Sequence, residues 1–314
     1  MKQYIPKKPK RWGIKVISRN GIEGFTHDFM IYDGKSPKVK ESCGFQAGDL
    51  VLKVCESLPK NKNHIVYFDS FFNSVELQLQ LKKDGIHSVG TLQKNRLRGC
   101  VLRSEKDLRR MGRGSFDCRT ERDSRISIVR WYDNRVVQLS STYMYVSIDP
   151  ISKVQRFDRK TRKKLEVQCP AIVKEYNQHM GGVDKFDMLM SLYRCDHKSK
   201  KWYRPIFLWC INLCLVNAWL HYKRDCSTLD ISQNAQMDLL SFSAKVSHSL
   251  VLGKKGCDTS QSKRQRGRPS SAASGDTNEC SSPPPKRREA SKPKPQADIR
   301  TDQVAHWPSC NGSC

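Results

Sequence analysis

The sequence predicts a mixed α/β fold, because strand-like and helix-like patterns alternate over residues 12–92. Two β-rich runs flank the pair Asn20-Gly21, which is a strong signal for a β-hairpin. A strand pattern, a helix pattern and a further strand pattern follow, as in a sheet that helices cover. The expected strands are 12–18, 25–32, 64–68 and 86–92, and the expected helices are 50–58 and 74–83.

The rest of the chain divides by composition into a basic stretch, a helical stretch and a tail. Residues 94–130 hold twelve lysines and arginines against five acidic residues, with little periodicity. From residue 170 the pattern is helical, and the helix predicted at 203–223 is so apolar that we expect it to be largely buried. The tail is too rich in Ser, Pro, Lys and Arg to offset its ordering entropy. The expected domains are 1–93 (first part of a core), 94–165 (an inserted basic module), 166–250 (second, helical part of the core), 251–300 (a disordered basic linker) and 301–314 (a separate terminal segment).

The composition indicates a polyanionic partner. Lys and Arg number 57 against 31 Asp and Glu, a formal net charge of +26, and such an excess attracts phosphate backbones. Charge alone does not separate a nucleic-acid enzyme from a ribosomal or histone-like binder. The sequence has no run of about 18 apolar residues, so we expect no membrane-spanning helix and no membrane partner. The 13 cysteines are odd in number and irregularly spaced, which favours free thiols over a disulfide framework.

Asp69 is the first candidate catalytic residue, because it directly follows the strand predicted at 64–68. A carboxylate at the carboxyl end of a strand lies at the edge of an α/β sheet where ligands bind. Two-metal phosphoryl transfer uses carboxylates in such a place, since Mg²⁺ is a hard cation that takes oxygen ligands. An alternative stays open, because aspartate is also a good helix N-cap and a helix follows Asp69.

Asp184 and Asp187 form the second candidate. Positions three apart at the start of a helix share one face, so both carboxylates can point the same way. Gly181 and Gly182 precede them and allow the backbone to approach a ligand closely. The alternative is ordinary complementation of the helix dipole by acidic residues in the first turn.

Several stretches of the sequence resemble motifs of piggyBac-family transposases. Residues 67–74 (YFDSFFNS) resemble the motif of the second catalytic aspartate, and 175–184 (EYNQHMGGVD) resemble that of the third. Residues 2–15 (KQYIPKKPKRWGIK) are similar to the segment that follows the first aspartate, and 204–219 to the last helix of the core. The resemblance spans 1–225 in order and spacing, and it is especially close to the domesticated piggyBac-derived proteins of animals.

This resemblance implies a ribonuclease-H-like mixed sheet with an inserted basic domain, and a site of three aspartates that binds two Mg²⁺ ions. One ion would activate a water or a DNA 3′-hydroxyl, and the other would stabilise the leaving oxygen. Asp69 corresponds to the second metal ligand, Asp184 to the third, and Asp187 to a further acidic residue that supports the site. The family's first aspartate lies on a central strand upstream of the segment that matches here. We therefore expect the sheet to lack that strand, between 11–18 and 64–68, and the fragment to be inactive.

Basic side chains are the candidate DNA contacts. We expect phosphate contacts from the inserted module and from the start of the last core helix, although a solvated surface would explain the same charges. Residues 263–269 (KRQRGRP) are similar to an AT-hook, which places Arg in the minor groove of A·T-rich DNA, and a linker or nuclear-import run is an equal alternative. The candidate DNA-binding residues are Arg96, Arg98, Arg109, Arg110, Arg113, Lys198, Lys200, Lys201, Arg266 and Arg268.

The end of the chain is similar to the start of the Cys-rich zinc-binding domain with which the family closes. Cys310 and Cys314 supply two ligands there, whereas a structural Zn²⁺ site needs four. The resemblance therefore implies a chain truncated at both ends, with Zn²⁺ only in the missing part of that domain.

The sequence as a whole predicts a piggyBac transposase-derived protein that binds double-stranded DNA. Residues 283–288 (PPPKRR) support nuclear import, so the nucleus is the expected location. A domesticated, non-catalytic chromatin or DNA-binding protein and a decayed copy without function are the alternatives. Formation of a homodimer is left open.

Overall fold

The computed structural model describes residues 2–4, 6, 11–144, 152–158, 162–194 and 199–253. All of these residues belong to one compact unit, 1–258. The predicted linker beyond residue 253 and the segment 301–314 lie outside the described residues. The candidate residues Lys198, Arg266, Arg268, Cys310 and Cys314 lie outside them as well.

The N-terminal part of the chain folds as two antiparallel hairpins and a helix. β1 (Lys2–Tyr4) pairs with β2 (Trp12–Ile14), and β3 (Val16–Asn20) pairs with β4 (Thr26–Ile31), which confirms the predicted hairpin. The amide of Gly21 closes the β3–β4 turn on the carbonyl of Phe25 at 2.8 Å. Gly24 takes a φ of +90° in this turn, a conformation that side chains with a Cβ resist. α1 (Gln46–Cys55) follows and packs against the hairpin.

A five-stranded mixed sheet forms the centre of the fold, in the order β5-β6-β9-β8-β7. Its strands are β5 (Ile65–Phe68), β6 (His87–Thr91), β7 (Phe116–Thr120), β8 (Ser127–Tyr132) and β9 (Val136–Ser141). β5 and β6 are parallel and joined by α2 (Val75–Lys83), whereas the other pairs are antiparallel. The predicted strand–helix–strand unit and the mixed sheet are therefore confirmed. Strands of the module predicted at 94–165 continue the same sheet through the β6–β9 pair.

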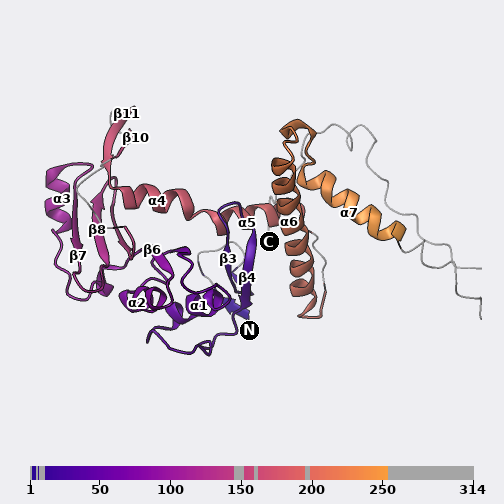
Figure 1. The fold of residues 1–314 in the computed structure, drawn as a ribbon, viewed down its shortest axis with the longest axis horizontal. Coiled ribbons are helices and arrows are strands. Elements are labelled where there is room, and N and C mark those ends of the chain that lie inside the picture. The colour runs from indigo at the N-terminus through magenta and orange to yellow at the C-terminus, as the bar shows by residue number, and fades with distance from the viewer. Residues whose placement is uncertain are drawn as a thin grey trace, which may run out of the picture. The chain divides into compact units, whose positions relative to one another are not determined.

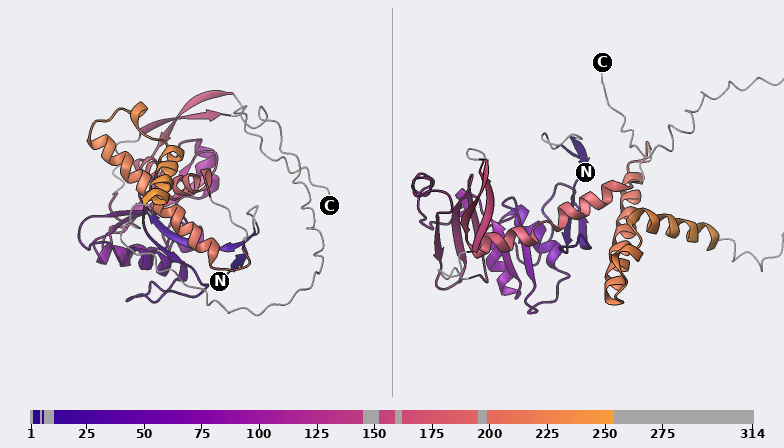
Figure 2. Two further views of the ribbon diagram at one scale, coloured as in Figure 1. Left: turned by 90° about the vertical axis from the view of Figure 1, so that its right-hand side faces the viewer. Right: turned by 90° about the horizontal axis from the view of Figure 1, so that it is seen from above.

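The remaining elements are a third hairpin and the predicted helices. β10 (Ser152–Asp158) and β11 (Lys163–Cys169) form a two-stranded sheet of their own (Figure 1). α4 (Ala171–His179) contacts β6 and β9, and α5 (Gly182–Leu192) contacts β3 (Figures 1 and 2). The helical pattern predicted from residue 170 is confirmed. The other helices are η1 (Lys94–Arg96), α3 (Glu105–Met111), α6 (Arg204–Thr228), η2 (Gln233–Ala235) and α7 (Leu239–Gly253).

Separate apolar clusters hold these elements together. One joins α1, α2, β3 and β5 around Leu50, Leu77 and Leu81, each at most 1% exposed. A second joins the sheet to α4 around Val129 and Ile172. Full burial of each such side chain contributes about 1.5–3 kcal/mol relative to exposure. These clusters fix β5 and α4, the two elements that lead to the candidate carboxylates.

α6 is more exposed than its composition predicts. Only Leu213, Val216 and Cys226 are buried along it, whereas Phe207 is 62% exposed. The prediction of a largely buried helix is wrong: α5, α7 and β4 pack against part of its surface, whereas Phe207 and Ile211 are exposed. Of the described helices, α6 alone is long and apolar enough to span a membrane by length and composition, a test that core helices of soluble proteins also pass.

Candidate functional site

A pocket of about 620 Å³ lies between β3 and β5. β3 pairs only with β4 and β5 only with β6 among the described strands, so each has one edge without a strand partner. The oxygen Oδ1 of Asn20 and the nitrogen Nε2 of His64 are buried without a hydrogen-bond partner, and both residues line the pocket. The floor is apolar, formed by Val51, Val54 and Cys55 of α1. Asp69 and Asp184 line this same pocket.

Asp69 follows β5 directly and is held by a tight turn. Its Oδ1 accepts a hydrogen bond from the amide of Phe71 at 2.8 Å. The N-cap of α2 is Ser74, whose hydroxyl accepts from the amide of Leu77 at 3.2 Å. The alternative that Asp69 caps this helix is therefore wrong, and its carboxylate is exposed at the pocket.

The loop that follows Asp69 is fixed by Arg96. The Nη1 of Arg96 donates to the carbonyls of Ser70 at 2.9 Å and Asn73 at 2.7 Å, and its guanidinium lies 4.1 Å from the ring centroid of Phe45. Asn73 is fully buried and donates to the carbonyl of Thr91 at 2.9 Å. The hydrogen bonds from Arg96 to the loop carbonyls, and from the side-chain amide of Asn73 to Thr91, thus fix the loop that positions the carboxylate of Asp69.

Lys15 is a cation near Asp69 that the sequence analysis did not single out. Its Nζ lies 4.5 Å from the ring centroid of Phe71. Partial burial lowers the pKa of Lys15, and the negative charge of Asp69 opposes that shift. In the sequence, Lys15 is the last residue of the segment 2–15, and that segment indicates the family without singling out one of its residues.

Asp184 lies in the first turn of α5, whose start packs on the β3–β4 turn. A Cβ on Gly182 would lie 2.5 Å from the carbonyl oxygen of Gly21, so only glycine allows this approach. A Cβ on Gly181 would meet nothing within 4 Å. Asp187 is exposed one turn further along α5 and is not among the residues that line the pocket.

A half-buried polar cluster ties β5 to α4 beside the pocket. The carboxylate of Glu175 accepts from the hydroxyls of Tyr67 at 2.7 Å and Tyr143 at 3.1 Å. The ring of His179 stacks on Tyr67, with centroids 4.9 Å apart, and its Nδ1 lies 2.9 Å from the carbonyl oxygen of Glu175. Burial, and then the hydrogen bonds to Tyr143 and Glu175, raise the pKa of Tyr67. Because β5 leads to Asp69 and α4 leads to Asp184, the cluster fixes the two halves of the pocket relative to each other.

The donor set of the pocket suits a hard divalent cation. Asp69 and Asp184 offer carboxylate oxygens, which Mg²⁺ prefers. Within the described part of the chain, no three acidic, His or Cys side chains are close enough together to form a metal site. The structure thus brings two of the predicted ligands to one pocket and leaves Asp187 outside it.

Several of the predicted DNA contacts are engaged within the protein. Besides Arg96, the guanidinium of Arg113 pairs with the half-buried carboxylate of Asp133, and Arg98 pairs with Glu76. Arg110 lies 3.9 Å from an acidic neighbour one turn away. The remaining described candidates, all exposed, are Arg109, Lys200 and Lys201.

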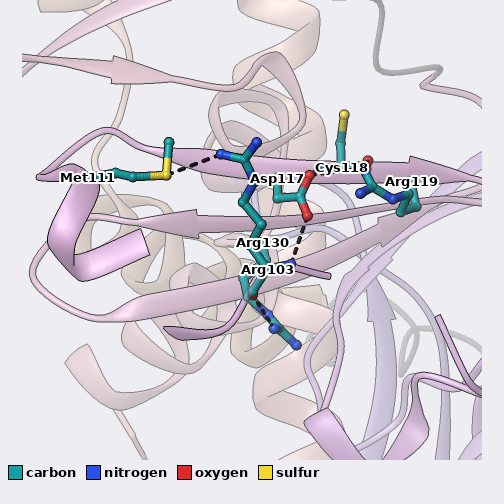
Figure 3. A network of polar contacts seen from close by, with 6 residues as sticks. All are labelled: Arg103, Met111, Asp117, Cys118, Arg119 and Arg130. Carbon is teal, nitrogen blue, oxygen red and sulfur yellow. Dashed lines mark hydrogen bonds and ion pairs between the residues drawn. The ribbon is translucent and has the colours of Figure 1, made fainter. Parts of the chain in front are cut away.

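Further arginines of the basic stretch hold the strands together (Figure 3). Asp117 accepts from the backbone amide of Arg103 at 2.8 Å and from the guanidinium of Arg119 at 3.0 Å. Arg130, only 8% exposed, donates to the carbonyl of Arg103 at 2.7 Å and to Gln138 at 2.9 Å. Much of the positive charge predicted for DNA contact therefore has a structural use.

Comparisons with known proteins place these features in a family. The model of a family described as Transposase IS4 matches residues 1–219. The chain is 36% identical over 225 residues to the human piggyBac transposable element-derived protein 3, covering 71% of this chain and 37% of that protein. It is 30% identical over 267 residues to the human piggyBac transposable element-derived protein 2, covering 84% and 44%. It thus spans less than half the length of either relative.

The fold is similar to that of a solved transposase. A cryo-EM structure described as a piggyBac transposase synaptic complex with hairpin DNA matches with a TM-score of 0.62 and 21% identity. The match covers 84% of this chain and 52% of the other. At this level of identity the likeness concerns the architecture.

Proposed function

Because the chain belongs to the transposase family described as Transposase IS4, we propose that it is a piggyBac transposase-derived DNA-binding protein. Its pocket between β3 and β5 is, in this proposal, the site of the family's phosphoryl transfer. The observation that carries the proposal is that Asp69 and Asp184, far apart in the sequence, line one pocket. Each also occupies the motif position that predicted it.

The pocket has the chemistry for divalent cations, which transposases of this family generally use. Asp69 and Asp184 would hold them, with Mg²⁺ as the expected ion. Bound there, two such ions would supply the Lewis acidity that activates a water or 3′-hydroxyl and stabilises the leaving oxygen. The chain's own residues prepare the site: Arg96 and Asn73 fix the loop after Asp69, and Glu175 ties β5 to α4. Lys15 offsets part of the negative charge.

We further propose that the β3–β4 hairpin and the five-stranded sheet are parts of one ribonuclease-H-like sheet. The space between β3 and β5 is then the position of a further strand that carries the family's first aspartate. Unpartnered edges of β3 and β5, and the buried unsatisfied atoms of Asn20 and His64, support this proposal, since buried polar groups are otherwise paired. A strand in this space would supply backbone partners to both edges.

The proposed partner is double-stranded DNA. The solved relative is described as a complex with hairpin DNA, and the net charge of +26 suits the same partner. We also propose a nuclear location and a homodimer.

The first test uses the chain of residues 1–314. We expect it to bind duplex DNA with an affinity that falls steeply with salt, and to show no Mg²⁺-dependent cleavage of duplex ends. After addition of a segment that supplies a strand for the space between β3 and β5, together with its aspartate, cleavage should appear. Asp69→Ala and Asp184→Ala should then each abolish cleavage while DNA binding stays nearly unchanged, with Glu56→Gln as the control. Cleavage that persists in either variant would refute the site.

The second candidate function is a domesticated, non-catalytic DNA-binding protein. The observation that favours it is that the acidic side chains lining the described pocket are two, Asp69 and Asp184. Salt-dependent DNA binding together with cooperative folding, but without cleavage even after the strand is supplied, would select this candidate.

A further inference from the structure

The β10–β11 hairpin is buried on one face at its base, at Val167 and Cys169, and is exposed further along that face and on the other. Its strands pair in antiparallel register from Ser152 opposite Cys169 to Asp158 opposite Lys163. On one face, Val167 and Cys169 pack with Trp131 of the sheet. The indole of Trp131 also donates to the carbonyl of Gln168 at 2.8 Å. The base of the hairpin is therefore anchored in the core.

The other face carries an exposed aromatic residue among basic side chains. Phe157 is 56% exposed and lies directly opposite Lys164 in the register. Side chains on opposite partners of an antiparallel pair lie on the same face, so Phe157 and Lys164 are neighbours there. Lys163 lies on the opposite face of the hairpin from Phe157 and Lys164, and Asp158 is its partner in the register. On the face of Phe157 and Lys164, the charge of Glu166 is matched by Lys153 at 3.4 Å.

The charge of the hairpin suits a nucleic acid. Residues 152–169 hold seven lysines and arginines against two acidic residues. Arg96, Arg113 and Arg130, by contrast, are committed to contacts within the protein. Lys163 and Lys164 are exposed, as is Arg109 elsewhere in the predicted module, so these side chains can reach an external polyanion.

The hairpin is also joined directly to the candidate site. β11 leads through the buried Pro170 into α4, whose C-terminal turn holds His179 at the pocket that Asp69 and Asp184 line. A duplex bound on the hairpin would therefore be held at a set position relative to α4. This continuity favours duplex DNA over an acidic protein as the occupant, since DNA is what the pocket is proposed to process.

We propose that the β10–β11 hairpin is a DNA-binding element, in which the exposed Lys163 and Lys164, one on each face, contact phosphates and Phe157 contacts sugar or base. Lysine–phosphate contacts supply the salt-dependent part of the affinity, and an apolar side chain against sugar or base supplies a part that salt leaves unchanged. The proposal rests on the proposed function only in that the chain binds duplex DNA.

The test measures affinity for a fluorescent DNA duplex by anisotropy over a series of salt concentrations. Lys163→Ala combined with Lys164→Ala should lower the slope of log K against log salt by about 1.8, which is two phosphate contacts at about 0.9 each. The control combines Lys38→Ala with Lys40→Ala, two exposed lysines in the loop before α1, and should leave the slope nearly unchanged. Equal slopes for the two double variants would overturn the proposal.

Phe157→Ala tests the second part. We expect an affinity loss of about tenfold with an unchanged salt slope, because the lost contact is apolar. Phe157→Trp should retain the affinity. Because Phe157 is exposed, thermal melting of both variants should match the unmodified chain, and a loss of affinity without that match would count against the proposal. Absence of any DNA binding by the unmodified chain would refute the proposed function as well, whereas binding that ignores the hairpin variants refutes this inference alone.

Discussion

The two carboxylates of the candidate site are held in different ways. Asp69 stands at the end of a sheet strand, in a loop whose carbonyls are bound by Arg96 and whose base is fixed by the buried Asn73. Asp184 stands on the exposed side of a helix start, held in place by the backbone contact between Gly182 and Gly21. The position of Asp69 thus depends on hydrogen bonds made by side chains, and the position of Asp184 on the close packing of backbone against backbone. The two halves should respond to different substitutions.

Arg96→Ala, which disrupts the hydrogen-bonded half, should have the largest effect on stability. It removes a charged donor from carbonyls of Ser70 and Asn73, and hydrogen bonds to charged groups contribute about 1.5–3 kcal/mol. We expect the free energy of unfolding in urea to fall by about 2–3 kcal/mol. Arg98→Ala is the matched control, because Arg98 forms an exposed ion pair worth at most about 1 kcal/mol. Equal losses in the two variants would mean that Arg96 does not hold the loop.

Gly182→Ala tests the packed half. The added Cβ would lie 2.5 Å from the carbonyl oxygen of Gly21, so α5 has to shift. Overpacking of this kind costs about 1–3 kcal/mol, measured as the free energy of unfolding. Gly181→Ala adds the same group in open space and should change stability by less than about 0.5 kcal/mol. If Gly181→Ala destabilises as much as Gly182→Ala, the contact with Gly21 is not what positions Asp184.

Glu175→Ala tests the link between the halves and should have a smaller effect. It leaves the hydroxyls of Tyr67 and Tyr143 without their shared acceptor, at a cost of about 1–2 kcal/mol. Glu175→Gln keeps an acceptor oxygen and should restore most of the loss in thermal melting. A glutamine variant no better than the alanine variant would indicate that the charge, rather than the hydrogen bonds, holds the cluster.

The same cluster gives a pH dependence. The pKa of Tyr67 is raised in the folded protein above its ordinary value of 10.0, chiefly by burial. The unfolded chain therefore loses this proton first, so stability is retained below about pH 10 and falls as the pH rises further. Other groups also titrate in this range, so the loss of stability above about pH 10 is compared between the unmodified chain and Tyr67→Phe. The loss should be smaller in Tyr67→Phe.

The elements of the fold were largely predictable from sequence, whereas their long-range contacts were not. Alternating β-rich runs around Asn20-Gly21 predicted the first hairpin, and the strand–helix–strand pattern predicted β5, α2 and β6. The pairing of β6 with β9 was not predicted, because strand partners distant in sequence leave no local pattern. The burial of α6 was overestimated for a related reason: apolar residues show that a helix can be covered, but not which faces have a neighbour.

In the candidate site, likewise, the residues were predictable from sequence and their contacts were not. Motif positions predicted Asp69 and Asp184, and both line one pocket. Arg96 was predicted to contact phosphate, whereas its guanidinium binds carbonyls of the loop after Asp69. Sequence could not reveal this, because the partners of Arg96 are backbone oxygens, which every residue has. Lys15 and Glu175 likewise became interpretable only through their neighbours.

Whether Asp69 and Asp184 act on one cation can be measured without enzymatic activity. Mn²⁺ is added to isotope-labelled chain, and the paramagnetic broadening of backbone amide signals is followed by NMR. A shared site predicts that signals from 69–73 and from 182–186 broaden together with one midpoint, and that Asp69→Asn removes the broadening from both segments. Broadening of 182–186 that persists in Asp69→Asn, or different midpoints for the two segments, would contradict a shared site.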